Sequence, residues 1–218
     1  MAIAIFDLDN TLLAGDSDYL WGRFLVEKGA VDGPYYEREN ERFYQLYKEG
    51  QLDIHEFLRF SLAPLRNHPK HKLEAWRSEF LQTRIDPLIS EQARQLVDKH
   101  RQAGDSLMII TATNAFVTRP IADRFGINIL IATEPETLDG QYTGGVAGEP
   151  SYREGKVLRL EAWLAEHDAD LQGSWFYSDS LNDLPLLERV DNPVAVDPDE
   201  TLRRVALQRQ WPILQLHG

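Results

Sequence analysis

The stretch Ala2-Ile3-Ala4-Ile5-Phe6-Asp7-Leu8-Asp9-Asn10-Thr11 decides the fold. An apolar run of five residues is typical of a buried strand, and an acidic pair follows where that strand ends. Because side chains alternate across a strand, Asp7 and Asp9 are expected to point the same way. Two carboxylates a few ångströms apart repel by about 4 kcal/mol at an effective dielectric near 20. The sequence therefore predicts that a bound cation lies between them.

The composition limits the class of protein. The 218 residues are enough for one substantial core, and we expect one domain with a sizeable insertion. The 23 basic and 35 acidic residues give a formal charge of −12, which argues against a nucleic acid or an anionic membrane as partner. No apolar run is long enough to span a bilayer, and no signal-type segment precedes the first strand. The absence of cysteine excludes disulfides and a cysteine nucleophile, so we expect a cytoplasmic protein.

The interval 14–86 carries helical periodicity only. Apolar residues recur at helical spacing, and glycine, proline and polar turns separate the segments. The predicted helices cover residues 19–28, 35–48, 54–65 and 73–81. We predict that residues 14–86 form one inserted helical cap subdomain, and that residues 1–13 and 87–218 form the core domain.

From residue 87 onward, strand and helix patterns alternate. The predicted strands cover residues 106–111, 127–132, 175–177 and 193–196, and the predicted helices cover residues 89–100, 116–125, 154–166, 181–190 and 200–208. Asp139-Gly140 is typical of a β-hairpin turn. Repeated alternation predicts an α/β fold with a Rossmann-like, doubly wound parallel sheet that carries helices on both faces.

Four polar features stand at the ends of predicted strands or at the start of the next helix, where open α/β sheets bind ligands. They are the acidic pair of residues 7–11, Thr111, Lys156, and the segment Ser178-Asp179-Ser180-Leu181-Asn182-Asp183. A lysine in the first turn of a helix opposes the helix dipole by about 0.3–1 kcal/mol, which suggests that Lys156 has a use.

Each feature also has a structural explanation. The acidic pair is compatible with a fragment of a calcium loop, although Leu12 stands where such a loop needs glycine. Thr111 is compatible with a plain β-branched strand residue, and Asp179 and Ser180 with a helix cap. Capping does not explain Asp183. The six histidines show no metal-binding spacing, and we expect them to be exposed or locally hydrogen-bonded.

Taken in order, the four features resemble the haloacid dehalogenase (HAD) superfamily of phosphohydrolases. The family's first motif, DxDx[TV], is matched by residues 7–11, its second by Thr111, its third by Lys156, and its acidic fourth motif by Asp179 and Asp183. The resemblance covers essentially the whole chain. The cap position and the DSxxD form of the fourth motif are similar to subfamily IB, which contains phosphoserine phosphatases and some histidinol-phosphate phosphatases.

The resemblance implies a magnesium-dependent phosphate-monoester hydrolase that works through an aspartyl-phosphate. Asp7 is then the nucleophile, and Asp9 is the general acid and base, whose pKa should be the higher of the two. Asp7, the Asp9 carbonyl and Asp179 would hold Mg²⁺, and Asp183 would bind the ion, orient its water or pair with Lys156. The groups expected to bind phosphate are Thr111, Lys156, Asn182 and the backbone N–H groups of Leu8 and Ala112.

Substrate choice is expected to lie in the cap. Asp16 falls where phosphoserine phosphatases hold the substrate ammonium with Glu. Their carboxylate-binding Arg aligns with Ser61, and Arg59 stands two residues earlier. Asp16 and Arg59 are thus the candidate substrate-binding residues. The pattern favours an amine-bearing phosphate without a carboxylate, such as histidinol phosphate, and phosphoserine is the alternative.

Two other kinds of protein remain as alternatives. A receiver domain also combines Asp, Thr, Lys and magnesium, but its metal-binding acids are adjacent and its phosphorylated Asp lies on a later strand. The strand that ends at Thr111 carries no Asp. Phosphotransfer to a second substrate, as in phosphomutases of the same superfamily, is the closer alternative.

Overall fold

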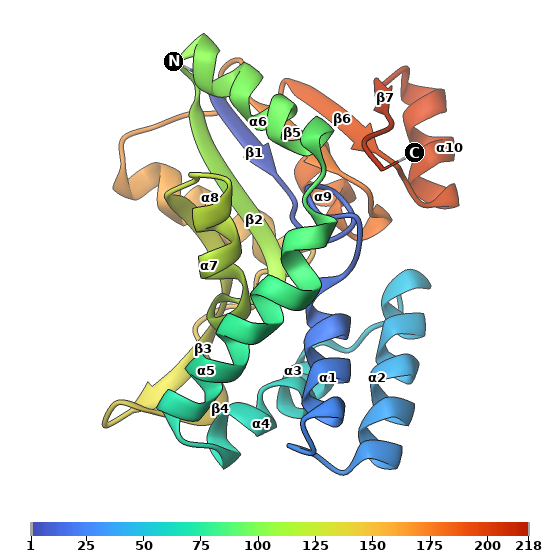
Figure 1. Ribbon diagram of the computed structural model, residues 1–218. Helices are drawn as coiled ribbons and strands as arrows, with labels where there is room; N and C mark the ends of the chain where they lie inside the picture. Colours follow the sequence, from blue (N-terminus) through green and yellow to red (C-terminus); the bar gives the residue numbers. More distant parts are fainter. Residues whose placement is uncertain (1, 218) are drawn as a thin grey trace.

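The computed structural model describes residues 2–217, which form an α/β core with a helical insertion at one end (Figure 1). The strands are β1 (Ile3–Phe6), β2 (Ser106–Asn114), β3 (Ile129–Leu138), β4 (Gln141–Ala147), β5 (Trp175–Ser178), β6 (Asn192–Val196) and β7 (Ile213–Leu214). They form a sheet in the order β4-β3-β2-β1-β5-β6-β7, in which only the β3–β4 pair is antiparallel. The strand order reverses beside β1, so the carboxyl end of β1 is the position expected for a ligand.

Helices cover both faces of the sheet. They are α6 (Glu91–Ala103), α7 (Ala115–Arg124), α8 (Glu154–Glu166), α9 (Leu184–Leu187) and α10 (Glu200–Arg209). Alternation along β1 sends Phe6 into one hydrophobic cluster with residues of α6 and α7. It sends Ile5 into a second cluster with residues of α8, α9 and α10. The predicted doubly wound α/β fold is confirmed.

Residues 14–86, which we call the helical insertion, contain no strand. The elements between β1 and α6 are α1 (Ser17–Glu27), α2 (Gly33–Lys48), α3 (Ile54–Ser61), α4 (Ala63–Asn67), α5 (Lys70–Phe80), a π-helical turn (Leu81–Ile85) and a 3₁₀ turn (Asp86–Leu88). An antiparallel bridge joins Leu13 to Ile89, where the chain leaves and re-enters the core. None of the helices within residues 2–217 is long and apolar enough to cross a membrane.

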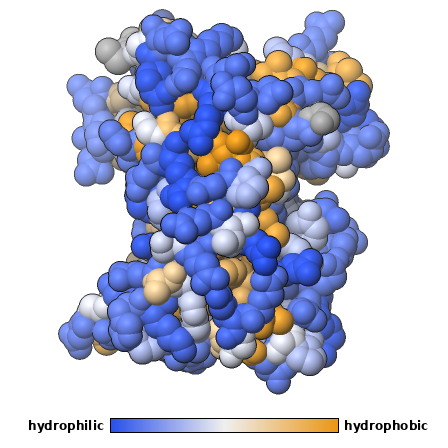
Figure 2. Space-filling view, viewed as in Figure 1, coloured by the Kyte–Doolittle hydropathy of each residue, from blue (hydrophilic) through white to orange (hydrophobic). Residues whose placement is uncertain are grey.

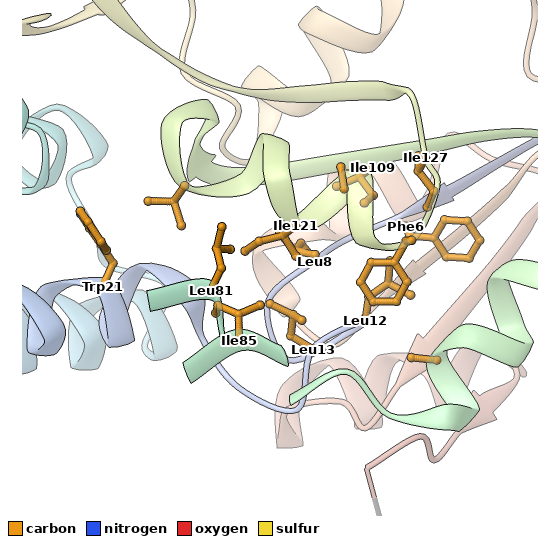
Figure 3. Close-up of a cluster of buried hydrophobic side chains, with 14 of the residues drawn as sticks. Phe6, Leu8, Leu12, Leu13, Trp21, Leu81, Ile85, Ile109, Ile121 and Ile127 are labelled. Atoms are coloured by element: carbon orange, nitrogen blue, oxygen red, sulfur yellow. The ribbon is translucent and has the colours of Figure 1, made fainter. Parts of the chain in front are cut away.

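One hydrophobic cluster, which we call the shared cluster, runs from the sheet into the helical insertion (Figure 3). Phe6 and Ile109 come from the sheet, whereas Trp21 comes from α1 and Phe80 from α5. The Trp21 and Phe80 rings contact edge to face, with centroids 5.2 Å apart. No residue of α2 belongs to this cluster. The insertion is therefore fixed to the core through a cluster that includes residues of α1, α3, α4 and α5. Phe43 of α2 belongs instead to a separate small cluster with Leu52 and the core residue Tyr152.

Several predicted element bounds are wrong for local reasons. The predicted helix 54–65 is interrupted at Leu62, because Pro64 lacks the N–H that would continue the hydrogen-bond ladder. The predicted helix 181–190 is a 3₁₀ turn followed by the single turn α9, again beside a proline. β2 continues past Thr111 to Asn114. β7 has only two residues and leaves no periodic signal in the sequence.

Candidate active site

A pocket opens at the carboxyl end of β1, between the core and the helical insertion. Its core side is lined by residues of the first motif and of β2, and its other side mainly by α1, α2 and α3. The lining residues are Asp7, Asp9, Asp16, Asp18, Tyr19, Asn40, Phe43, Tyr44, Tyr47, Leu52, Ile54, Phe57, Thr111, Ala112, Thr113 and Tyr152. Figure 2 shows the molecule narrowing where its upper and lower parts meet. The switch point of the sheet thus faces a pocket with acidic and aromatic walls.

Asp7 lies in a buried ion-pair network. It follows β1 and its backbone N–H donates to the Tyr177 carbonyl of β5 at 2.9 Å. The Lys156 ammonium, from the first turn of α8, lies 2.8 Å from Asp7 Oδ1 and 2.7 Å from Asp183 Oδ1. Ser178 donates to the other oxygen of Asp183 at 2.7 Å. Two carboxylates therefore compensate for the unfavourable position of Lys156 at the start of a helix, where its charge opposes the helix dipole.

Asp9 has a different set of partners. Its Oδ1 accepts the Ser17 backbone N–H at 2.6 Å, and its Oδ2 accepts the Thr113 hydroxyl at 2.8 Å. Thr111 Oγ1 lies farther away, 3.5 Å from Asp9 Oδ2. Asp9 therefore links the start of α1 to the end of β2. The two N-terminal acids thus have different partners, because Asp7 pairs with Lys156.

Thr11 connects the first motif to the last. Its buried hydroxyl donates to Asp179 Oδ1 at 3.0 Å and accepts the Asp179 backbone N–H at 3.0 Å. The same hydroxyl lies 3.5 Å from Asp7 Oδ2. The two carboxylate oxygens lie 3.0 and 3.5 Å from one atom, so they are at most 6.5 Å apart. The N-terminal acids and the segment near residue 180 therefore converge.

Burial sets the electrostatics of the two N-terminal acids. It raises the pKa of Asp7 to about 7, and Lys156 offsets part of that rise. Burial, together with Asp16, raises the pKa of Asp9 to about 6. The charges of Asp183 and Asp9 add to the rise at Asp7, whereas hydrogen bonds from Ser17 and Thr113 limit the rise at Asp9. The predicted order, with Asp9 the higher, concerns the site with Mg²⁺ bound and stays a prediction.

The donor set fits a hard divalent cation. Burial raises the pKa of Asp179 well above its usual range, and the charges of Asp7 and Asp183 add to this. Its side chain receives a hydrogen bond from Thr11 and none from a basic residue. Carboxylate and carbonyl oxygens are the ligands that Mg²⁺ prefers. Within residues 2–217, however, no group of three acidic or histidine side chains is arranged to hold a metal ion, and Asp183 pairs with Lys156.

The remaining predicted residues fall in different places. Asp16 and Ala112 line the pocket, whereas the Leu8 side chain is buried in the shared cluster. Asn182 is buried, and its amide contacts the carbonyl of Tyr47 in α2 at 2.9 Å. Arg59 is exposed on α3 and lines two other surface hollows, so the structure does not bring it to the pocket.

The sequence analysis predicted no role for four residues of the site. Thr113 lies two residues after Thr111, so alternation along β2 was a signal for it. Ser178 directly precedes the fourth motif. Asp18 lines the pocket beside Asp16, and burial, then Asp16 and Asp9, raise its pKa well above the usual range. Ser17 acts through its backbone N–H, which no side-chain pattern reveals.

The fold and the site define an α/β phosphatase, with carboxylates and a buried lysine gathered at the switch point of a parallel sheet. A model of the haloacid dehalogenase-like hydrolases matches residues 4–188, and the chain belongs to this family. The receiver-domain alternative is thereby excluded.

Individual relatives narrow the comparison. A protein of Neisseria meningitidis named histidinol-phosphatase is 48% identical over 216 residues, which cover 97% of each chain. A phosphoserine phosphatase of Mycobacterium tuberculosis is 33% identical, over 97% of this chain and 70% of that protein. A solved structure from Bordetella pertussis, of a protein with unknown function, has a TM-score of 0.93 and 45% identity, over 99% of this chain and 98% of that one. A solved structure of a substrate-bound phosphoserine phosphatase has a TM-score of 0.73, over 100% of this chain and 93% of that one. At 19% identity, this similarity supports the fold alone.

Proposed function

We propose that this phosphatase is a magnesium-dependent histidinol-phosphate phosphatase that works through an aspartyl-phosphate on Asp7. The observation that carries the substrate assignment is the charge of the pocket wall. Asp16 and Asp18 lie at the wall formed by α1, and no lysine or arginine is among the residues that line the pocket. Such a wall suits a substrate with a cationic end and leaves a carboxylate without a partner.

The geometry of Asp16 supports this assignment. Asp16 caps α1, and both backbone N–H groups that it accepts bind its Oδ1, at 2.9 Å each. Its Oδ2 therefore retains capacity for a substrate ammonium group. The aromatic residues Phe43, Tyr44 and Phe57 line the same pocket and provide faces for a planar ring. The relative from Neisseria meningitidis that is named histidinol-phosphatase is consistent with this choice.

The reaction would proceed in two steps. A carboxylate oxygen of Asp7 attacks phosphorus, the bond from phosphorus to the substrate oxygen breaks, and Asp9 donates its proton to the leaving oxygen. Water then attacks the phosphoryl group, Asp9 takes a proton from that water, and Asp7 is regenerated as inorganic phosphate leaves. At the end of the cycle, Asp7 is again a free carboxylate and Asp9 is again protonated.

Other residues would orient the phosphoryl group and neutralise its negative charge. Lys156 lies beside Asp7 and is placed to stabilise negative charge on the transferring group. Thr111 lines the pocket and would donate to a phosphate oxygen. Asp7, Asp179 and the backbone carbonyl of Asp9 would hold Mg²⁺, which supplies charge neutralisation when bound. We also propose that residues 14–86 act as the cap, and that the protein works in the cytoplasm, where it needs no disulfide.

The test is phosphate release from histidinol phosphate and from phosphoserine, each with Mg²⁺ and with no acceptor added. We expect histidinol phosphate to have the higher kcat/KM, and Asp7→Asn to reduce release from it at least 1000-fold, on the order expected for a lost nucleophile. Faster release from phosphoserine would reassign the substrate. Transfer that occurs only with an added acceptor would favour a phosphotransferase, and activity retained in Asp7→Asn would reject the nucleophile.

A further inference from the structure

The C-terminal end of α2 and the turn after it meet the core through polar contacts at two carbonyl groups, beside the small hydrophobic cluster of Phe43, Leu52 and Tyr152. The last carbonyls of a helix have no partner within the regular helix and accept hydrogen bonds from the turn or from other groups. The Tyr47 carbonyl accepts the Asn182 side-chain amide at 2.9 Å, and the Gly50 carbonyl accepts an Nη2–H of Arg153. Figure 1 shows α2 running from the far end of the helical insertion toward the core, so that this end lies nearest to it. Two core side chains thus add hydrogen bonds at the end of a helix that belongs to the insertion.

Asn182 and Arg153 are joined to each other. Arg153 Nε donates to Asn182 Oδ1 at 3.1 Å, and the Tyr152 hydroxyl donates to the same oxygen at 3.0 Å. The Asn182 amide nitrogen also contacts Ser180 Oγ at 3.2 Å. An asparagine side chain has two donor hydrogens and two acceptor sites, so all of them are used here. In this conformation Asn182 holds α2 and has no capacity left for a phosphate oxygen.

The backbone is adapted to this contact on both sides. Arg153 has φ 50° and ψ −120°, a conformation rare for a residue other than glycine. Backbone strain of this kind persists where the surroundings enforce it. Opposite lies Gly50, with φ +67°, where a Cβ atom would lie 2.9 Å from Arg153 Nη2. Glycine at position 50 adopts this positive φ without strain and leaves room for the guanidinium to approach.

Charge also favours the contact. The C-terminal end of a helix carries a partial negative charge, and a cation placed there is stabilising. α2 has no member in the shared cluster, and its hydrophobic contact with the core is the small cluster of Phe43, Leu52 and Tyr152. It does carry Phe43, Tyr44 and Tyr47 of the pocket wall. Movement of the C-terminal end of α2 would therefore displace one wall of the pocket and leave the shared cluster intact.

We propose that Arg153 is a positioning residue that, together with Asn182, latches the C-terminal end of α2 to the core and so keeps the substrate pocket closed. Release of the Gly50 carbonyl by Arg153 lets this end of α2 move away, and the pocket then exchanges its contents with solvent. The same release frees the Asn182 amide. The effect on turnover rests on the proposed function, whereas the latch itself does not.

The first test is hydrogen exchange, which needs no substrate. In the wild type the Gly50 N–H donates to the Tyr47 carbonyl and the Gln51 N–H donates to the Leu46 carbonyl. In Arg153→Gln we expect these two amides to exchange at least tenfold faster, while amides of α6 and β2 keep their rates. Arg204→Gln is the matched control, because Arg204 binds only groups of its own helix, α10. Unchanged exchange at residues 50 and 51 in Arg153→Gln would overturn the latch.

The second test is kinetic, with histidinol phosphate and Mg²⁺. We expect Arg153→Gln to raise KM at least fivefold and to change kcat less than threefold, since the closed pocket is less populated but the reacting groups are untouched. Arg153→Lys keeps the charge and should give an intermediate KM, and it also serves if Arg153→Gln does not fold. Faster exchange with an unchanged KM would overturn the claim that the latch closes the pocket. If histidinol phosphate is not turned over at all, the proposed function fails, and the exchange experiment still decides the latch.

Discussion

Replacing Lys156 by methionine tests the buried ion-pair network most directly. The ammonium is 2% exposed and lies 2.8 Å from Asp7 and 2.7 Å from Asp183. At an effective dielectric of 20, each contact is worth about 6 kcal/mol. Removing the lysine also removes its own cost of burial, which is several kcal/mol, so the net loss of unfolding free energy should be about 3–5 kcal/mol. Methionine has a similar volume, so no large cavity contributes.

The loss of unfolding free energy in Lys156→Met should depend on pH. Burial already raises the pKa of Asp7 to about 7, well above the value of 3.8 in an unfolded chain, and loss of Lys156 raises it further. A carboxyl group whose folded-state pKa is raised contributes stability at low pH that is lost as the pH rises through that pKa. The penalty for Lys156→Met should therefore be smaller at pH 5.5 than at pH 8.

Urea unfolding of the metal-free protein, followed by tryptophan fluorescence at both pH values, measures this penalty. Lys99→Met, at an exposed position on α6, is the control and should change the free energy by no more than about 0.5 kcal/mol. A penalty for Lys156→Met below about 1 kcal/mol at pH 8, or one that shrinks as the pH rises, would refute the reasoning.

Three further predictions concern other contacts. Thr11→Val removes both hydrogen bonds to Asp179, so it should cost about 1–3 kcal/mol in urea unfolding and raise the Mg²⁺ concentration for half-maximal activity; an unchanged metal titration would contradict this. Burial and Asp16 raise the pKa of Asp9 to about 6, so Asp9→Asn should gain stability relative to the wild type as the pH rises through 6. If the unfolding free energies of the two proteins ran parallel against pH, this prediction would be wrong. Phe80→Ala should cost about 3–5 kcal/mol in a single calorimetric transition, whereas two transitions would show that the insertion unfolds separately.

The core of the fold was predictable because its strands are apolar runs of a few residues. β1 and β5 are buried on both sides, and each is followed at once by acidic residues. The order of strands and helices then required a parallel sheet, which brings the carboxyl ends of the strands together. Asp7, Lys156 and Asp183 are distant in the chain, and the topology explains why they lie at one edge of the sheet, whereas their roles were implied by the family resemblance.

The parts that were not predictable depend on tertiary contacts. Arg59 stands on a helix whose orientation is set by packing, and a helical period does not say which face meets the pocket. The pKa values of Asp7 and Asp9 depend on which neighbours each acid meets, and Ser17 contributes a backbone group that any residue type could supply. Asn182 matches a phosphate-binding position of phosphoserine phosphatases, but in the structure its side chain is hydrogen-bonded to the Tyr47 carbonyl and to Arg153.

The shared cluster limits where this scaffold can acquire new specificity. Substitutions in α1 or α5 disturb Trp21 or Phe80 and so affect the stability of the entire molecule. The side chains of α2 that face the pocket, such as Asn40 and Tyr44, lie outside that cluster. Grafting α2 from a relative should therefore alter substrate preference in a protein that still folds, whereas grafting α1 or α5 alone should yield insoluble chains. Divergence among relatives is then expected to concentrate in α2, the one helix of the insertion that has no residue in the shared cluster.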